Sequence, residues 1–358
     1  MVAAPRKRIV SASDRLYRVL LLCYPKEFRR SYRLEMAQTF RDCCQEALAE
    51  HGLWGVIRLW SFVLSDLAGT ALIEHYRAFA ARFLNVEGRQ VATLVSPFSL
   101  AVAQRTDVGR IRHVNEDSVV SVVPEDPVVM TKKGALFVVA DGMGGHTAGD
   151  VASLMAINTV NDAYYQNGSD GIADALRLAI KQANASIYQA NMARSPQPSK
   201  SEMMGTTCVA AVLQGDTVYV ANVGDSRAYF VRDGQIMQIS QDHSIVAEEI
   251  RAGLITKDQA RGHPQHNVIT RCLGNAEVEI DIFTEHIEEG DLLVLCTDGL
   301  SNLLSDEELG MIVQQFEPQE SVQRLVERAN EQGGTDNITA LWYASPKWRV
   351  QAPATNEI

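Results

Sequence analysis

Three aspartates in this chain follow apolar runs or glycines in a pattern that suggests an ion site. Asp141 follows the apolar run 137–140 and precedes a glycine, Asp298 ends a second apolar run in the same way, and Asp336 follows two glycines. A strand end holds a carboxylate firmly, and a neighbouring glycine lets a backbone carbonyl approach a bound ion. Mg²⁺ and Mn²⁺ take such oxygen ligands. Any one of these aspartates is better explained as the cap of a turn, but the three together suggest one hard-cation site.

Two further segments carry residues with suitable chemistry. Arg112 is followed within five residues by the acidic pair Glu116-Asp117. A planar guanidinium suits phosphate oxygens and the acidic pair can hold a metal-bound water, although a surface salt bridge explains this segment equally well. Asp225 lies between two expected strands. It is either the cap of a hairpin turn or one more carboxylate at the ion site.

The residues from 98 onward are expected to form strands and a few helices that position these side chains. Turn signals at 214–216 and 232–234 indicate antiparallel hairpins. Many hairpins with segregated helices favour an α+β fold over a doubly wound parallel sheet. Helices are expected at about 148–165, 171–193 and 319–332. The expected strands are 100–104, 118–123, 135–140, 207–213, 217–222, 227–231, 280–284, 291–296 and 338–343.

The N-terminal part has a different pattern. Residues 13–84 are predicted to be helical, because apolar side chains recur every three or four residues from Phe28 to Ala47 and again beyond Val56. We expect Gly52 and Gly55 to break this helix and the aromatic stripe to be core. The expected domains are a helical domain at 1–90, a linker at 91–97, a larger domain at 98–346 and a tail at 347–358.

Composition and charge limit the classes of function. The chain has 358 residues, with 33 Lys and Arg against 44 Asp and Glu, a net charge of −11. Residues 1–90 carry a net charge of +5 and the remainder −16, so we expect the larger domain to attract divalent cations and not to bind nucleic acid. Six cysteines without a CxxC pair indicate a reducing cytoplasm. We expect neither a signal peptide nor a transmembrane segment.

Together these residues resemble the metal-dependent PPM (type 2C) protein serine/threonine phosphatases in their bacterial form. The resemblance covers roughly residues 100–344 and rests on the order and spacing of seven motifs. The motifs are Thr106-Asp107-x-Gly109-x-x-Arg112-x-x-Asn115-Glu116-Asp117, Asp141-Gly142-Met143-Gly144-Gly145-His146, Met204-Gly205-Thr206-Thr207, Gly224-Asp225-Ser226-Arg227, His263-Pro264-Gln265, Asp298-Gly299-Leu300 and Gly334-Thr335-Asp336-Asn337.

The resemblance implies an α-β-β-α layered sandwich of two antiparallel sheets, with two Mn²⁺ or Mg²⁺ ions between the sheets. Asp141 would bridge both ions and the Gly142 carbonyl would bind one. Asp298 and Asp336 would complete the other. Asp225 matches the aspartate that helps hold a third, weaker ion in such enzymes.

The implied reaction is direct hydrolysis of phosphoserine or phosphothreonine by a metal-bridging hydroxide, with no phosphoenzyme. Glu116 would hold a metal-bound water and Arg112 would bind the substrate phosphate. Arg112, Asp141 and Asp298 are thus the expected catalytic residues. Eukaryotic relatives carry a histidine directly after the Asp-Gly pair, whereas this chain has Met143. This leaves the general acid open: a metal-bound water could protonate the leaving group, and His146 is either a helper or a surface histidine. The segment from about 243 to 275 would form a flap beside the cleft.

Residues 20–40 resemble the small helical prefix domain that precedes some bacterial ABC-type permeases, so the N-terminal domain is expected to bind a protein partner or to regulate. The substrates would be phosphoproteins, targets of a bacterial Ser/Thr kinase or an anti-sigma-factor antagonist, which the sequence does not separate. The alternative is a catalytically weak, phosphoprotein-binding scaffold. Its mark would be lost metal ligands, and Asp141, Asp298 and Asp336 are all present.

Overall fold

The computed structural model describes residues 3–24, 26–84, 101–144, 148–169, 171–194, 199, 202–260 and 263–344. The chain divides into two compact units, one of Met1–Arg89 with Met192–Gln197, the other of Gln90–Asn191 with Pro198–Ile358. The expected linker at 91–97, the expected tail at 347–358, and the motif residues Gly145 and His146 lie outside the described residues.

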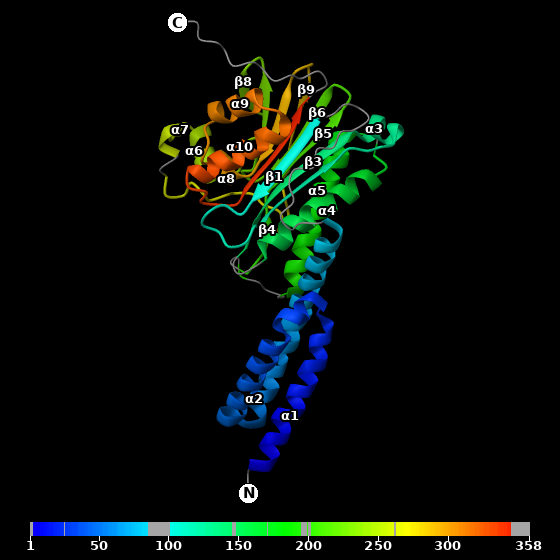
Figure 1. Ribbon diagram of the computed structural model, residues 1–358, viewed down its shortest axis with the longest axis vertical. Helices are drawn as coiled ribbons and strands as arrows, with labels where there is room; N and C mark the ends of the chain where they lie inside the picture. The colour runs from blue at the N-terminus through cyan, green and yellow to red at the C-terminus, as the bar shows by residue number, and fades with distance from the viewer. Residues whose placement is uncertain are drawn as a thin grey trace. The chain divides into compact units, whose positions relative to one another are not determined.

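The first unit contains α1 (Ala3–Leu20), the short 3₁₀ helix η1 (Leu21–Cys23) and α2 (Lys26–Leu84), which lie side by side in Figure 1. The element α2 consists of two helices that meet at a kink at Gly52, whose φ of 59° is readily adopted only by glycine. The break expected at Gly52 is confirmed, whereas Gly55 lies within the helix and the expectation of a break there was wrong.

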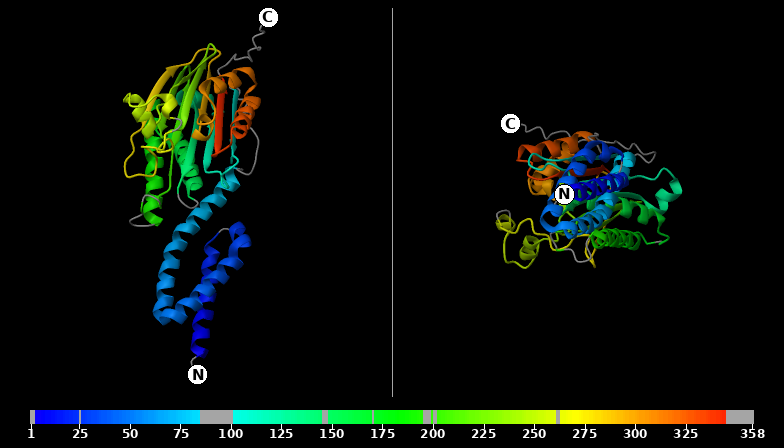
Figure 2. Two further views of the ribbon diagram at one scale, coloured as in Figure 1. Left: turned by 90° about the vertical axis from the view of Figure 1, so that its left-hand side faces the viewer. Right: turned by 90° about the horizontal axis from the view of Figure 1, so that it is seen from below.

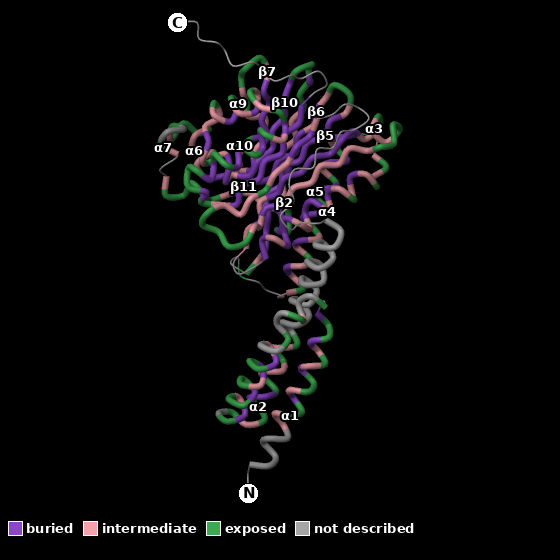
Figure 3. Tube along the Cα trace, viewed as in Figure 1, coloured by how far each residue is buried: buried purple, intermediate pink, exposed green. Residues whose placement is uncertain are grey.

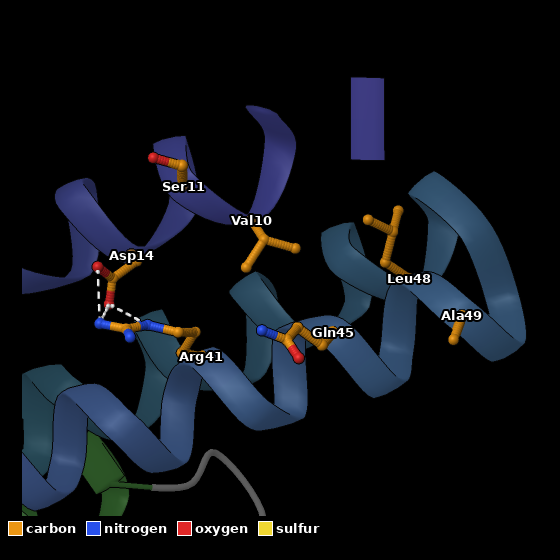
Figure 4. A pocket seen from close by; sticks show the side chains of 7 residues that line it. All are labelled: Val10, Ser11, Asp14, Arg41, Gln45, Leu48 and Ala49. Carbon is orange, nitrogen blue, oxygen red and sulfur yellow. Dashed lines mark hydrogen bonds and ion pairs between the residues drawn. The ribbon is translucent and has the colours of Figure 1, made fainter. Parts of the chain in front are cut away.

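Phe40 of the expected aromatic stripe is buried in the core of this unit and Trp60 packs against that core, so the prediction is confirmed for these two residues. The rings of Tyr17 and Phe40 stack at 4.1 Å, and Trp60 meets Phe40 edge-on at 5.1 Å. A pocket between α1 and α2 has Asp14 and Arg41 among its lining residues, and Arg41 Nη2 donates to Asp14 Oδ1 at 3.3 Å (Figure 4). None of the described helices combines the length and the apolarity that crossing a membrane requires.

Two antiparallel sheets form the centre of the second unit. One sheet has the strand order β1-β11-β10-β7-β8, and the other has the order β2-β3-β5-β6-β9, with β4 paired to β3. The strands are β1 (Ala101–Asp107), β2 (Asp117–Val122), β3 (Ala135–Met143), β4 (Gly205–Thr206), β5 (Cys208–Gln214), β6 (Thr217–Val223), β7 (Arg227–Arg232), β8 (Gln235–Gln238), β9 (Asp281–His286), β10 (Leu292–Cys296) and β11 (Ile338–Ala344).

Helices cover both outer faces of the sheets. The helix α4 packs on β2 and β3, and α10 packs on β1 and β11, on opposite sides of the sandwich in Figure 2. The remaining helices connect strands. The helices are α3 (Pro127–Lys133), α4 (Gly149–Gln166), α5 (Ile172–Arg194), α6 (Ile245–Arg251), α7 (Lys257–Ala260), α8 (Asp298–Ser301), α9 (Asp306–Gln315) and α10 (Pro318–Glu331).

The central strands β3, β5, β7, β10 and β11 are buried on both faces, which explains their unbroken apolar runs. Phe137 on β3 and Leu295 on β10 belong to the core between the sheets, whereas Trp342 on β11 packs with Leu325 of α10. The buried strands form the continuous purple centre of this unit in Figure 3. The expected α+β, α-β-β-α sandwich, preceded by helices, is therefore confirmed.

Local sequence patterns missed several elements. The strand β8 and the helices α3, α6, α7 and α9 were not among the expected elements. The two hairpins β5–β6 and β7–β8 form at the expected turns. The turn at Asp225 is not a hairpin, because β6 and β7 belong to different sheets. This turn instead carries the chain from one sheet to the other.

Candidate metal centre

Asp141 lies near the end of β3, and its backbone is fixed on both sides. Its N–H donates to Thr207 Oγ1 at 2.9 Å, and its carbonyl accepts from Thr207 N at 2.9 Å and from Thr206 Oγ1 at 2.8 Å. On the neighbouring strand β2, Asp117 stands directly opposite Asp141. The sheet therefore brings two buried carboxyl groups together before any ion is considered.

The carboxylates around Asp141 repel one another electrostatically. Burial, and then the charges of Asp117, Asp298 and Asp225, hold the pKa of Asp141 well above its usual range. Burial and the charge of Asp336 also raise the pKa of Asp298. Several carboxylates that disfavour one another's charge form a site that a divalent cation would stabilise.

Asp298 is the first residue of α8 and directly follows the buried strand β10 and Thr297. Its Oδ2 accepts from Asn302 Nδ2 at 3.1 Å, while its buried Oδ1 faces no hydrogen-bond donor among the described residues. A buried carboxylate oxygen without a donor is costly in a folded protein. An ion ligated at this oxygen would remove that cost, so the residue fits the role of a metal ligand.

Asp117 connects the two sheets, a role that the sequence did not indicate. Its Oδ2 accepts from Thr297 Oγ1 at 2.9 Å and from Thr339 Oγ1 at 2.7 Å. Thr339 lies on β11 of the opposite sheet, and Thr297 directly follows β10 of that sheet. Burial, together with the charge of Asp298, raises the pKa of Asp117 to about 7, although the two hydrogen bonds act to lower it. The only local signal was the position of Asp117 beside Glu116.

Glu116 and Gly142 lie against the start of α4. The Gly142 N–H donates to the Glu116 carbonyl at 3.1 Å, and a Cβ on Gly142 would overlap the Gly149 carbonyl. A Cβ on Gly149 would lie 2.5 Å from Glu116 Oε1. Burial raises the pKa of Glu116, opposed by Arg112. The two glycines therefore allow the Glu116 carboxylate to reach the first turn of α4.

Arg112 lies at the exposed edge of this cluster. Its Nη2 donates to Asp336 Oδ2 at 2.8 Å, and its Nη1 lies 3.9 Å from Glu116 Oε2. Partial burial disfavours the charge of Arg112, but Asp336 and then Glu116 outweigh it and raise the pKa of the guanidinium. Because 47% of the side chain is exposed, the guanidinium can meet an anion from solvent.

Asn337, also within a predicted motif, ties the loops together. Its Oδ1 accepts from the Glu116 N–H at 2.8 Å, and its Nδ2 donates to the carbonyls of Val108 and Val114, each at 3.0 Å. Neighbouring Asp336 is thereby positioned beside Arg112. The sequence placed Asn337 in a motif but gave it no role.

Asp225 completes the cluster from the turn between β6 and β7. Burial, with the charges of Asp298 and Asp242, raises the pKa of Asp225 to about 8. Its charge in turn acts on Asp141. The structure thus brings Asp225, Asp141 and Asp298 within electrostatic range, and it brings Arg112, Glu116 and Asp336 together at the rim.

In the part of the chain that the structure describes, no three His, Cys, Asp or Glu side chains converge as ligands of one ion. Asp336 is instead paired with Arg112. Hard cations commonly take one or two carboxylates with backbone carbonyl and water oxygens, so this arrangement is compatible with the expected donor set. The argument for a metal ion rests on Asp298 Oδ1 and Asp117 Oδ1, two buried carboxylate oxygens that accept no hydrogen bond from the described residues.

Comparisons with known proteins agree on one family. The family model for protein phosphatase 2C matches residues 114–341. The serine/threonine phosphatase stp of Listeria monocytogenes is 38% identical over 241 residues, which cover 66% of this chain and 92% of that protein.

Solved structures show the same fold. The Streptococcus agalactiae serine/threonine phosphatase is 35% identical with a TM-score of 0.62, covering 68% of this chain and 99% of its own. The catalytic domain of the serine/threonine protein phosphatase PstP, solved in complex with two manganese ions, is 35% identical with a TM-score of 0.59. It covers 68% of this chain and 97% of its own.

Proposed function

This chain belongs to the protein phosphatase 2C family and is a metal-dependent serine/threonine protein phosphatase, and we propose that its active centre is the acidic cluster around Asp141. The observation that carries the proposal is the set of buried, mutually destabilising carboxylates between the sheets. A scaffold that only binds phosphoproteins would have no reason to keep this electrostatic arrangement, since each such group lowers stability.

We assign the ion ligands by carrying them over from the motifs that this chain shares with its family. Asp141 would contact two ions, with the Gly142 carbonyl and a water held by Glu116 at one of them. Asp298 and Asp336 would contact the other, and Asp225 a third, weaker one. The ions would be Mn²⁺ or Mg²⁺, since all donors are hard oxygens. When bound, they lower the pKa of water and offset the charge of a phosphoryl group.

The side chains of the chain itself would bind and orient the substrate. Arg112, now paired with Asp336, would exchange part of this pairing for the phosphate of the substrate, because its planar fork matches two phosphate oxygens. Its position at the exposed edge lets a phosphoserine or phosphothreonine side chain enter from solvent. Met143 cannot donate a proton, so water in this site, or His146 of the same motif, would have to protonate the leaving serine or threonine.

A phosphopeptide assay tests this function. We expect the full chain to release phosphate from a phosphothreonine peptide in the presence of Mn²⁺. This release should stop when excess EDTA is added. Asp298→Ala should lower turnover by more than about 100-fold, because it removes an ion ligand. Asp291→Ala is the matched control, since Asp291 is also buried but pairs with Arg232 at the other end of β10. Activity that survives both EDTA and Asp298→Ala would refute the assignment.

For the rest of the chain we propose the domains given by the sequence: a helical module at 1–90, a linker at 91–97, the phosphatase domain at 98–346 and a tail at 347–358. The helical module would resemble a permease prefix domain and bind a protein partner, and the substrates would be phosphoproteins of a bacterial Ser/Thr kinase. Comparing the full chain with a chain that starts at Ser96 tests direct regulation. Equal kcat and KM would exclude it under the assay conditions.

A further inference from the structure

The turn 224–226, which carries Asp225 between the sheets, has little freedom. Gly224 has a φ of 107°, and a Cβ there would lie 2.6 Å from Thr207 Cγ2. On the other side of Asp225, the Ser226 hydroxyl shares a hydrogen bond of 2.7 Å with that of Thr207. Since Thr207 also accepts from the Asp141 N–H, the turn is built against the same residue that fixes Asp141.

One buried histidine holds the peptide groups of Gly224 on both sides. The Gly224 N–H donates to His243 Nδ1 at 3.1 Å, and the His243 N–H donates to the Gly224 carbonyl at 3.0 Å. Because Nδ1 accepts, the ring proton of the neutral imidazole lies on Nε2, which faces Asp281 Oδ2 at 3.0 Å. The His243 side chain is only 3% exposed, so its ring has a fixed orientation.

A second set of contacts joins His243 to the segment 244–271, which contains α6 and α7. The Thr270 N–H donates to the His243 carbonyl at 2.7 Å, and Ser244 forms an antiparallel bridge with Ile269. Arg271 Nη1, at the end of this segment, donates to Asp281 Oδ1 at 3.0 Å. His243 therefore lies where the segment meets the turn of Asp225.

We infer that His243 is a positioning residue that holds the two peptide groups on either side of Gly224, directly before Asp225, and thereby sets the affinity of the weakest ion site. The inference rests on the proposed function, in which Asp225 is an ion ligand. His243 would touch neither ion nor substrate. Residues that orient a metal ligand contribute strongly to affinity, because an unfixed ligand must be ordered again each time the ion binds.

Two substitutions separate the two hydrogen bonds of the ring. His243→Asn places an amide oxygen near the position of Nδ1, so it keeps an acceptor for the Gly224 N–H and loses the contact with Asp281. His243→Gln places an amide nitrogen near the position of Nε2, so it keeps a donor for Asp281 and leaves the Gly224 N–H without an acceptor. Both are neutral, so a change of charge does not distinguish them.

The readouts are Mn²⁺ binding by electron paramagnetic resonance of the free ion, hydrogen exchange of the Gly224 amide, and phosphopeptide kinetics at saturating Mn²⁺. We expect His243→Gln to weaken the weakest Mn²⁺ site by about 10–100-fold and to speed exchange of the Gly224 amide. The tighter sites and KM should change little. His243→Asn should stay close to the wild type in all three readouts.

The outcomes separate this inference from the proposed function. Wild-type protein that binds Mn²⁺ while His243→Gln binds it equally well would overturn the inference alone, as would equal losses in both variants. Wild-type protein that binds no Mn²⁺ would overturn the proposed function and the inference with it. If His243→Gln does not fold, His243→Ala replaces it: this change also removes the acceptor of the Gly224 N–H, and unaltered affinity at the weakest site would then refute the role of His243.

Discussion

The stability of the ion-free protein should fall as the pH rises from 5.5 to 7.5. The perturbation acts on the buried carboxyl groups of the cluster, of which Asp117 has a pKa raised to about 7 and Asp225 to about 8. The unfolded chain releases these protons near pH 4, whereas the folded chain still holds them. Stability is therefore fully present below about pH 4 and is lost progressively up to about pH 8.

The size of the effect follows from proton counting. Between pH 5.5 and 7.5 the folded state would hold between one and two protons more than the unfolded state at these sites, and each costs about 1.4 kcal/mol per pH unit. Over these two pH units a single extra proton corresponds to about 3 kcal/mol, which is the smallest effect that we expect. For a domain of this size this corresponds to a fall in Tm of about 6–12 °C.

Differential scanning calorimetry in EDTA at both pH values measures this difference. Asp225→Asn removes one titrating group and should reduce it, whereas Asp162→Asn, an exposed carboxylate on α4, is the control and should not. Added Mn²⁺ should raise Tm more at pH 7.5 than at pH 5.5, because the ion competes with protons for the same oxygens. A Tm in EDTA that is equal or higher at pH 7.5 would refute the assignment of a strained acidic cluster.

Two further predictions follow from single contacts. Arg112→Lys keeps the charge but loses the planar fork, so kcat/KM for a phosphothreonine peptide should fall by about 10–100-fold at saturating Mn²⁺, and an unchanged kcat/KM would exclude Arg112 from phosphate binding. Thr339→Val removes one donor from the buried Asp117 carboxyl, so urea unfolding should show a loss of about 1–3 kcal/mol. Thr217→Val, at the start of β6, is its control and should stay within about 0.5 kcal/mol.

The sequence predicted most of the sandwich because its central strands are buried on both faces. Runs such as 135–140 are apolar without interruption, and turn residues separate the hairpin strands. The misses have local causes. The strand β8 has exposed and half-buried residues in alternation, and α9 is short, so neither gives a strong apolar signal.

The sequence could predict a site residue only where its role can be recognised from its immediate neighbours in the chain. Asp141 and Asp298 stand at strand ends, which a sequence shows directly. The role of Asp117 depends on Thr297 and Thr339, which lie 180 and 222 residues away, and the spacing of a motif carries no information on such contacts. The same holds for His243, whose partners come from three separate segments.

Equilibrium binding of Mn²⁺ to the full chain and to Asp141→Asn tests the central claim most directly, because Asp141 is the one carboxylate assigned to both main ions. We expect the wild-type chain to bind at least two ions and the variant, if folded by circular dichroism, to lose both main sites. Wild-type binding that persists unchanged in Asp141→Asn would contradict a metal centre at this cluster.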